Sequence, residues 1–204
     1  MPLYNQINTT DFNIALWRIE EDNAYFEPHF VAHPDIKNEN KKLQWFASRH
    51  LVNTMLGTPT DIEKDEAGKP VLKTGAQNLS LSHTPIFAAA MLSPKNPVGI
   101  DLEMVNPKVE RIAHKFLRDD EIDAIHPDEK LEKLILYWSA KEALYKLYGK
   151  GEITFATQLL IQPFHLKLAG ELNAAIVGIE SPLENLTVHY QFFEDHVLTY
   201  VCHH

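Results

Sequence analysis

The C-terminal part of this chain carries the pattern that most limits how the chain can fold. Between residues 154 and 202, apolar and polar residues alternate in consecutive segments that no helical pattern separates. These segments read TFATQLLIQ, FHLKL, AAIVGI, LTVHYQFF and HVLTYVC. A period of two predicts strands with one buried face, and strands that follow one another without crossover helices pair antiparallel. The grouping of strands at the end of the chain therefore predicts an α+β fold.

Two long helices are expected upstream of these strands. They cover about 39–56 and 128–148, and each is followed by a glycine, a residue that often ends helices. On the first helix, Lys42 and Arg49 lie on one side, off the apolar stripe, and predict a basic edge. A short helix is expected to begin at Asp119, which would act as its N-cap. Further strands are predicted in ALWRIE, LSLSH, IFAAAML and VGIDLE.

The segment SPKNPVG marks the boundary that the sequence predicts between two lobes. Two prolines and an asparagine close one apolar segment and open the next, as in a surface connection. The expected lobes are 1–97 and 98–204, and no Gly/Ser-rich linker separates them.

Composition and charge narrow the class of protein. With 204 residues, of which 45% are hydrophobic, the chain can bury a core in one domain or in two small lobes. A net charge of −9 disfavours nucleic acid as a partner, because such proteins usually carry a basic surface. No apolar run approaches the ~20 residues of a membrane helix, and no signal-peptide pattern opens the chain. We therefore expect a cytoplasmic protein with no membrane partner. A single cysteine, Cys202, excludes an internal disulfide.

Two carboxylates share one face of the predicted strand VGIDLE. Alternation sends Asp101 and Glu103 to the same side as Gly99, and the apolar residues to the other side. Paired carboxylates suit a hard divalent cation, which prefers oxygen ligands. The same pattern is also typical of any half-buried strand with a polar outer face, and this segment alone does not separate the two interpretations.

The helix YWSAKEALYKLYGKG combines an apolar face with a polar one. The expected core face consists of Leu136, Ala140, Ala143 and Leu147. The opposite side carries Trp138, Ser139, Glu142, Tyr145 and Lys146. Glu142 and Lys146 lie one turn apart, so they could form an ordinary surface ion pair or could face a ligand.

The segment LSLSHT places a hydroxyl and an imidazole at a strand end, in Ser82 and His83. Both groups can donate to a phosphate, although this segment taken alone favours a structural histidine. The chain has no GxSxG, Walker or GxGxxG motif and no HExxH metal motif. The sequence therefore offers no motif that would support a serine hydrolase, a P-loop protein or a Rossmann-type enzyme.

The ordered set GKP, LSLSHT, VGIDLE and WSAKEALYKLYGKG resembles the 4'-phosphopantetheinyl transferase superfamily, of the longer type that activates nonribosomal peptide and polyketide synthases. That family carries a G-[IV]-D strand followed by a [WF]-[ST]-x-K-E-x-x-x-K helix. Both are intact here, and Asp101 and Glu142 lie about forty residues apart. The resemblance covers about residues 40–155. It implies a monomer of two similar α+β lobes related by a pseudo-twofold axis, with coenzyme A in the cleft between them.

The resemblance also implies roles for the acidic and basic residues of the second lobe, 98–204. Asp101, Glu103 and Glu142 would bind Mg²⁺, and Lys146 would hold the pyrophosphate of coenzyme A. Glu142, Glu103 or a metal-held water would deprotonate the acceptor serine. Glu121 matches an acidic family position near the metal, with Asp119 and Asp120 as neighbouring alternatives.

In the first lobe, 1–97, the resemblance implies a grip on coenzyme A. His83 and Ser82 would contact its phosphates, with His83 also stabilising the reacting oxygens. Arg49 and Lys69 would bind the 3'-phosphoadenosine end.

The implied function is transfer of the 4'-phosphopantetheine arm of coenzyme A to a serine of an apo acyl or peptidyl carrier protein, with release of adenosine 3',5'-bisphosphate. Two alternatives remain open on the same residues. One is a magnesium-dependent hydrolase of coenzyme A or nucleotide pyrophosphates, and the other is a non-catalytic module that binds coenzyme A. For a carrier, the expected docking patch consists of Lys115, Phe116, Leu117 and Arg118.

Overall fold

A computed structural model describes residues 3–31, 33–75 and 77–204. The chain divides into two compact units, Met1–Pro97 and Val98–His204. Both units combine an antiparallel sheet with one long helix, so the predicted α+β class is confirmed. Within the described ranges, no helix has the length and apolar character needed to cross a membrane.

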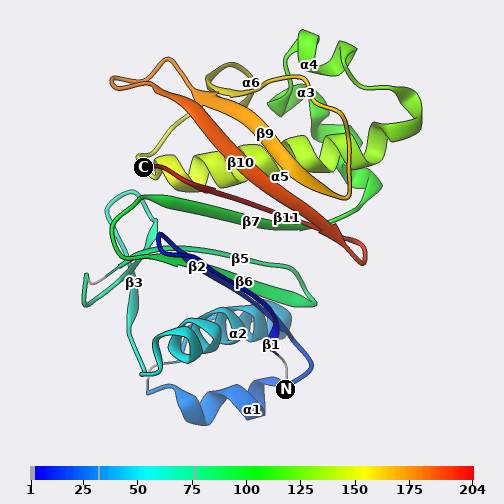
Figure 1. The fold of residues 1–204 in the computed structure, drawn as a ribbon. Coiled ribbons are helices and arrows are strands. Elements are labelled where there is room, and N and C mark those ends of the chain that lie inside the picture. The colour runs from blue at the N-terminus through cyan, green and yellow to red at the C-terminus, as the bar shows by residue number, and fades with distance from the viewer. Residues whose placement is uncertain (1–2, 32, 76) are drawn as a thin grey trace. The chain divides into compact units, whose positions relative to one another are not determined.

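The first unit is a four-stranded antiparallel sheet with a helix on one face (Figure 1). In spatial order its strands are β1 (Leu3–Asn8), β2 (Asn13–Arg18), β6 (Phe87–Ser93) and β5 (Asn78–His83). The remaining elements are α1 (Asn23–Phe26), a 3-10 turn (Glu27–His29), α2 (Glu39–Leu56), β3 (Ile62–Lys64) and β4 (Pro70–Leu72). The core lies between α2 and the sheet, where Phe46, Ala47 and Leu51 pack in one cluster with Ala88 and Ala90 of β6.

The ends of α2 follow from local chemistry. The Asn38 side chain accepts a hydrogen bond from the Lys41 amide at 3.0 Å, and Gly57 closes the helix with a φ of 68°. Such left-handed backbone favours glycine. The prediction for residues 39–56 is thus confirmed. The predicted basic edge of this helix differs from the structure at Lys42. Its Nζ forms an ion pair with a Glu27 oxygen at 2.6 Å, which offsets its positive charge.

The second unit is a five-stranded antiparallel sheet crossed on one face by a long helix (Figure 1). In spatial order its strands are β7 (Val98–Met104), β11 (His196–Cys202), β10 (Leu183–Phe193), β9 (Ala169–Ile176) and β8 (Leu159–Ile161). The long helix is α5 (Lys130–Tyr148), and the short ones are α3 (Ala113–Phe116), α4 (Asp119–Asp123) and α6 (Phe155–Gln158). Two 3-10 turns cover Pro107–Ile112 and Pro127–Glu129. As predicted, the α5 residues Leu136, Ala140, Ala143 and Leu147 are buried in the core of the second unit.

Three local predictions in this unit are wrong. The segment 154–158 was expected as a strand, but its larger part forms α6. Residues 164–168 have alternating character yet belong to no strand. The helix α4 begins one residue earlier than expected, because Arg118 and not Asp119 is its N-cap. The alternation was real in the first two cases, but neither segment pairs as a strand of the sheet.

Gly99 fixes how closely β7 approaches α5. A Cβ atom at this position would clash with the carbonyl oxygen of Ala143 and would lie 2.8 Å from the amide nitrogen of Leu147. These neighbours are helix backbone, which cannot rotate away as a side chain can. The strand and the helix can therefore pack this closely only because residue 99 has no side chain.

We expect Gly99→Ala to destabilise the second unit by about 3 kcal/mol, since the new methyl group must push α5 away from β7. Urea unfolding of the two proteins measures this difference. Gly170→Ala is the matched control, because the nearest atoms to a Cβ there belong to the Tyr190 side chain, at 3.1 Å, and a side chain can shift more readily than helix backbone. Equal losses in the two variants would contradict the role given to the Gly99 contact.

Candidate active site on β7 and α5

Asp101 is the most buried of the four residues Asp101, Glu103, Glu142 and Lys146. It lies on β7, opposite Thr199 of β11, and is only 3% exposed. One of its carboxylate oxygens accepts a hydrogen bond from Lys146 Nζ of α5 at 2.7 Å. A polar strand face turned to solvent is therefore excluded for Asp101. Lys146 also does more than form a surface ion pair within its own helix.

Glu103 lies two residues further along β7 and faces the same helix. Its carboxylate accepts a hydrogen bond from the indole N–H of Trp138 at 2.8 Å. Burial first, and then the negative charge of Asp101, raise the pKa of Glu103 to about 7. The Trp138 hydrogen bond and the Lys146 charge oppose this rise, and Glu142 adds to it.

Glu142 of α5 is the third carboxylate of this site. We call Asp101, Glu103 and Glu142 together the acidic group. Burial, followed by the charge of Asp101, raises the pKa of Glu142 to about 7, while Lys146 acts in the opposite direction. Each glutamate is thus close enough to Asp101 for their charges to repel. The structure brings together all four site residues predicted for this unit, namely Asp101, Glu103, Glu142 and Lys146.

The helix is held in register over the strand by a second pair of buried groups. Ser139 Oγ lies 2.9 Å from Thr199 Oγ1, which in turn donates to the Ser139 carbonyl oxygen at 2.9 Å. Ser139 is fully buried and so does not belong to the open polar face that the sequence suggested. Its hydroxyl ties α5 to β11 directly beside Asp101.

The acidic group fits a hard cation by its chemistry. In the described part of the chain, no three His, Cys, Asp or Glu side chains already stand in an arrangement that would hold a metal ion. Asp101, Glu103 and Glu142 nevertheless offer only oxygen donors, as Mg²⁺ prefers. Burial and the charge of Asp101 raise the pKa of both glutamates, Glu103 and Glu142, and a bound cation would offset this penalty on their charged forms.

A pocket of about 600 Å³ opens beside Glu142. Its lining is mainly apolar and aromatic and consists of Ile112, Lys115, Phe116, Trp138, Glu142, Tyr145, Ile153, Thr154 and Phe155. No sequence pattern indicated this pocket, because its walls come from three segments and the last of these was expected as a strand. The acidic group thus lies next to a space large enough for part of an organic substrate.

The predicted residues of the first unit lie on α2, on β5 and next to β4. The Arg49 guanidinium stacks on the Trp45 ring at 4.1 Å and donates to the Trp45 carbonyl oxygen at 3.4 Å. Burial lowers the pKa of Arg49 to about 10, so it remains a cation at neutral pH. Its orientation is fixed by the tryptophan, as suits a residue that binds an anion.

Lys69, Ser82 and His83 complete this first set. Lys69 directly precedes β4, and burial lowers its pKa while Asp65 raises it. Ser82 and His83 are the last two residues of β5, with Ser82 8% exposed and His83 exposed. The strand end predicted from LSLSHT is confirmed.

Glu121 has a different environment from the one expected. It is 2% exposed, and its oxygens accept hydrogen bonds from Lys141 Nζ at 2.6 Å and from the Arg118 and Ile161 amides at 3.0 and 3.3 Å. These three donors are all protein groups, and the role near the metal stays a prediction for Glu121. The docking patch also needs correction, because Phe116 and Leu117 are buried and only its basic members reach the surface.

Comparison with known proteins identifies the family. The model of the 4'-phosphopantetheinyl transferase superfamily matches residues 97–201, about half of the chain, and the chain therefore belongs to this superfamily. The 4'-phosphopantetheinyl transferase AcpT of Escherichia coli O157:H7 is 30% identical over 115 residues, which are 53% of this chain and 59% of that protein. The 4'-phosphopantetheinyl transferase psf-1 of Bacillus pumilus is 34% identical over 110 residues, 50% of this chain and 47% of that protein.

A third relative, the 4'-phosphopantetheinyl transferase HetI of a Nostoc species, is 29% identical over 121 residues, 52% of this chain and 51% of that protein. The similarity thus spans about half to three fifths of the length of these curated relatives. The family match contains the whole acidic group and both elements that carry it.

The raised pKa of Glu142 predicts a pH dependence of stability in metal-free buffer. Because the pKa rises from 4.5 to about 7 on folding, the folded protein binds the proton more tightly than the unfolded chain does. The resulting stability is complete below pH 4.5 and is lost as the pH rises through 7. We therefore expect Glu142→Gln to be more stable than the unchanged protein at pH 8, by about 2 kcal/mol, and to show little difference at pH 4.5. Urea midpoints measured from pH 4.5 to 8 with a chelator test this, and parallel profiles would contradict it.

Proposed function

We propose that this protein transfers the 4'-phosphopantetheine arm of coenzyme A to a serine of an apo acyl or peptidyl carrier protein, with Mg²⁺ as cofactor and adenosine 3',5'-bisphosphate as the second product. The observation that carries the proposal is the acidic group of Asp101, Glu103 and Glu142 beside Lys146, within the region that matches the family. The names of the relatives support the same activity. The proposal includes a cytoplasmic monomer.

The charges of the reactants explain why such residues are needed. The serine hydroxyl attacks the β-phosphate of coenzyme A, and both the diphosphate and the leaving bisphosphate are strongly anionic. Asp101, Glu103 and Glu142 would hold Mg²⁺, which supplies positive charge to the diphosphate oxygens. Lys146 already lies at Asp101 and can reach the same oxygens with its ammonium group.

The proton of the serine hydroxyl needs an acceptor near neutral pH. Glu142 and Glu103 both have a pKa raised to about 7, which is the range in which a general base works best. Of the two, Glu142 also lines the pocket, whereas the Glu103 carboxylate is engaged by Trp138. These contacts favour Glu142 as the base.

The first unit would bind the nucleotide end of coenzyme A. Arg49 carries a cation fixed on Trp45, and Lys69 adds a second ammonium group. Together they suit the 3'-phosphate, and Ser82 with His83 offers donors to the diphosphate. That the two sets of residues act on one coenzyme A molecule is part of the proposal.

Mass spectrometry of an apo carrier protein incubated with coenzyme A tests this function. Gain of the phosphopantetheine mass by the carrier, only when Mg²⁺ is present, is the expected result. Release of phosphopantetheine without a labelled carrier would instead support the pyrophosphate hydrolase. Binding of coenzyme A with neither reaction would support the non-catalytic module.

Asp101→Asn and Glu142→Gln are expected to lower the transfer rate by about 100-fold or more, since each removes a negative ligand from the cation. Both variants should remain folded, because the replacements keep the shape of the side chain. Initial rates at saturating Mg²⁺, with circular dichroism as a check on folding, measure the effect. Unchanged rates in either folded variant would remove that residue from the site.

Lys146→Ala should mainly impair the handling of coenzyme A, because it removes an ammonium group next to the proposed diphosphate site. We expect KM for coenzyme A to rise about 10-fold or more. Lys150→Ala, a replacement in the exposed segment that follows α5, is the control and should leave KM unchanged. If Lys146→Ala altered neither KM nor kcat, the Lys146 bond to Asp101 would serve stability alone.

A further inference from the structure

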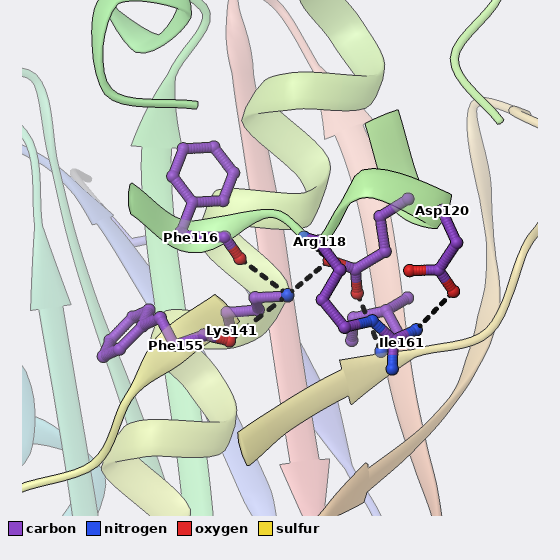
Figure 2. A network of polar contacts seen from close by, with 7 residues as sticks. Phe116, Arg118, Asp120, Lys141, Phe155 and Ile161 are labelled. Atoms are coloured by element: carbon purple, nitrogen blue, oxygen red, sulfur yellow. Dashed lines mark hydrogen bonds and ion pairs between the residues drawn. The ribbon is translucent and has the colours of Figure 1, made fainter. Parts of the chain in front are cut away.

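A buried ion pair lies behind the acidic group, at residues that the proposed chemistry does not use. Lys141 of α5 and Glu121 of α4 are 0% and 2% exposed, and Lys141 Nζ lies 2.6 Å from a Glu121 oxygen. The same ammonium group donates to the carbonyl oxygens of Phe116 at 2.7 Å and Phe155 at 3.3 Å. Figure 2 shows these acceptors converging on the lysine from different segments of the chain.

Glu121 extends the network to two further segments. It accepts the Arg118 amide at the start of α4 and the Ile161 amide at the end of β8 (Figure 2). The pair therefore holds three segments next to Lys141 of α5. They are the backbone from Phe116 to Arg118, the first residue of α6 and the end of the edge strand β8. The pair thus connects short elements that lie far apart in the sequence.

The two carbonyl groups bound by Lys141 belong to residues whose rings hold Trp138. The Phe116 ring meets the indole edge to face, with centroids 5.2 Å apart. The Phe155 ring stacks on it at 5.7 Å, with an interplanar angle of 27°. Because each carbonyl and ring belong to one residue, holding the backbone also sets where the ring lies.

Trp138 is the link from these rings to the acidic group. Its indole N–H, the only donor of that side chain, points at the Glu103 carboxylate over 2.8 Å. A tilt of the indole plane would lengthen this bond and free Glu103 to turn. The contacts thus form a continuous series from Lys141 through Phe116 and Phe155 to Trp138, and from Trp138 to Glu103.

The chemistry of a buried ion pair favours a positioning role over a purely stabilising one. Burying two charges costs free energy that their attraction barely offsets, and apolar replacements are often equally stable. An apolar pair could not, however, donate to two carbonyl groups from fixed directions. Lys141 supplies that directional contact, which packing alone does not.

We propose that the Lys141–Glu121 pair positions Glu103 for Mg²⁺ by holding Phe116 and Phe155 against Trp138. This inference rests on the proposed function, in which Glu103 is a metal ligand. Lys141, Glu121 and Trp138 are positioning residues that touch neither the substrate nor the cation. Groups that orient metal ligands typically change metal affinity or activity by about 10- to 100-fold when they are replaced.

The test variant is Lys141→Met combined with Glu121→Gln. It removes both charges together, so neither is left buried alone, and the introduced carboxamide keeps an oxygen for a backbone amide. Two quantities are measured. One is the exchange rate of the Trp138 indole N–H with solvent, by nuclear magnetic resonance, with the signal assigned from Trp138→Phe. The other is the Mg²⁺ concentration that gives half-maximal transfer.

We expect the indole N–H to exchange about 10-fold faster and the Mg²⁺ requirement to rise about 10-fold, with a smaller change in kcat at saturating metal. Lys133→Met is the matched control. It removes another buried lysine of α5. Lys133 contacts Glu129 and the Ala124 carbonyl oxygen, whereas Lys141 contacts the two residues that pack on Trp138. Both quantities should stay unchanged in this control.

Phe155→Leu provides a second route if the double variant does not fold, because it removes the stacked ring and leaves the ion pair intact. The proposal is overturned if the indole exchange rate in a folded variant equals that of the unchanged protein. It is also overturned if exchange accelerates while the Mg²⁺ requirement does not move. Absence of any transfer by the unchanged protein would instead count against the proposed function, and the exchange rates would still decide whether the pair holds Trp138.

Discussion

The close contact between β7 and α5 at Gly99 is the constraint on which the rest of the site depends. Asp101 lies on the strand, and Glu142 and Lys146 lie on the helix, so their separation is set by how near the two backbones come. A side chain at residue 99 would clash with the backbone of Ala143 and push the elements apart. The glycine of the G-I-D motif and the long helix of the W-S-x-K-E motif are thus parts of one packing arrangement.

This packing concentrates negative charge where water is scarce. Asp101, Glu103 and Glu142 share a partly buried place, and both glutamates are harder to ionise than in water. Lys146 and the Trp138 indole are the protein donors that offset part of this charge. A site of this kind is costly for stability alone, which is the physical reason to connect it with binding of a cation and an anionic substrate.

The sequence predicted the parts of the structure that depend on local pattern. Both long helices, their glycine ends and the core face of α5 follow from the spacing of apolar residues and from the left-handed backbone after each helix. The segment 164–168 was mispredicted because alternation is a local pattern, whereas a strand also needs backbone pairing along its length, and this segment is not part of the sheet. The ion pair of Glu121 with Lys141 was not predicted, since the two residues lie twenty positions apart and no local pattern connects them. The family motifs found the acidic group, but its pocket and the ring contacts of Trp138 required the folded chain.

The central claim is that Asp101 and the two glutamates bind one divalent cation together with the diphosphate of coenzyme A. Electron paramagnetic resonance with Mn²⁺ in place of Mg²⁺ tests this most directly, because free and bound Mn²⁺ give different signals. The account predicts one tightly bound Mn²⁺ per chain when coenzyme A is present, and loss of this binding in Asp101→Asn. Binding of Mn²⁺ with the same stoichiometry and affinity in Asp101→Asn would contradict it.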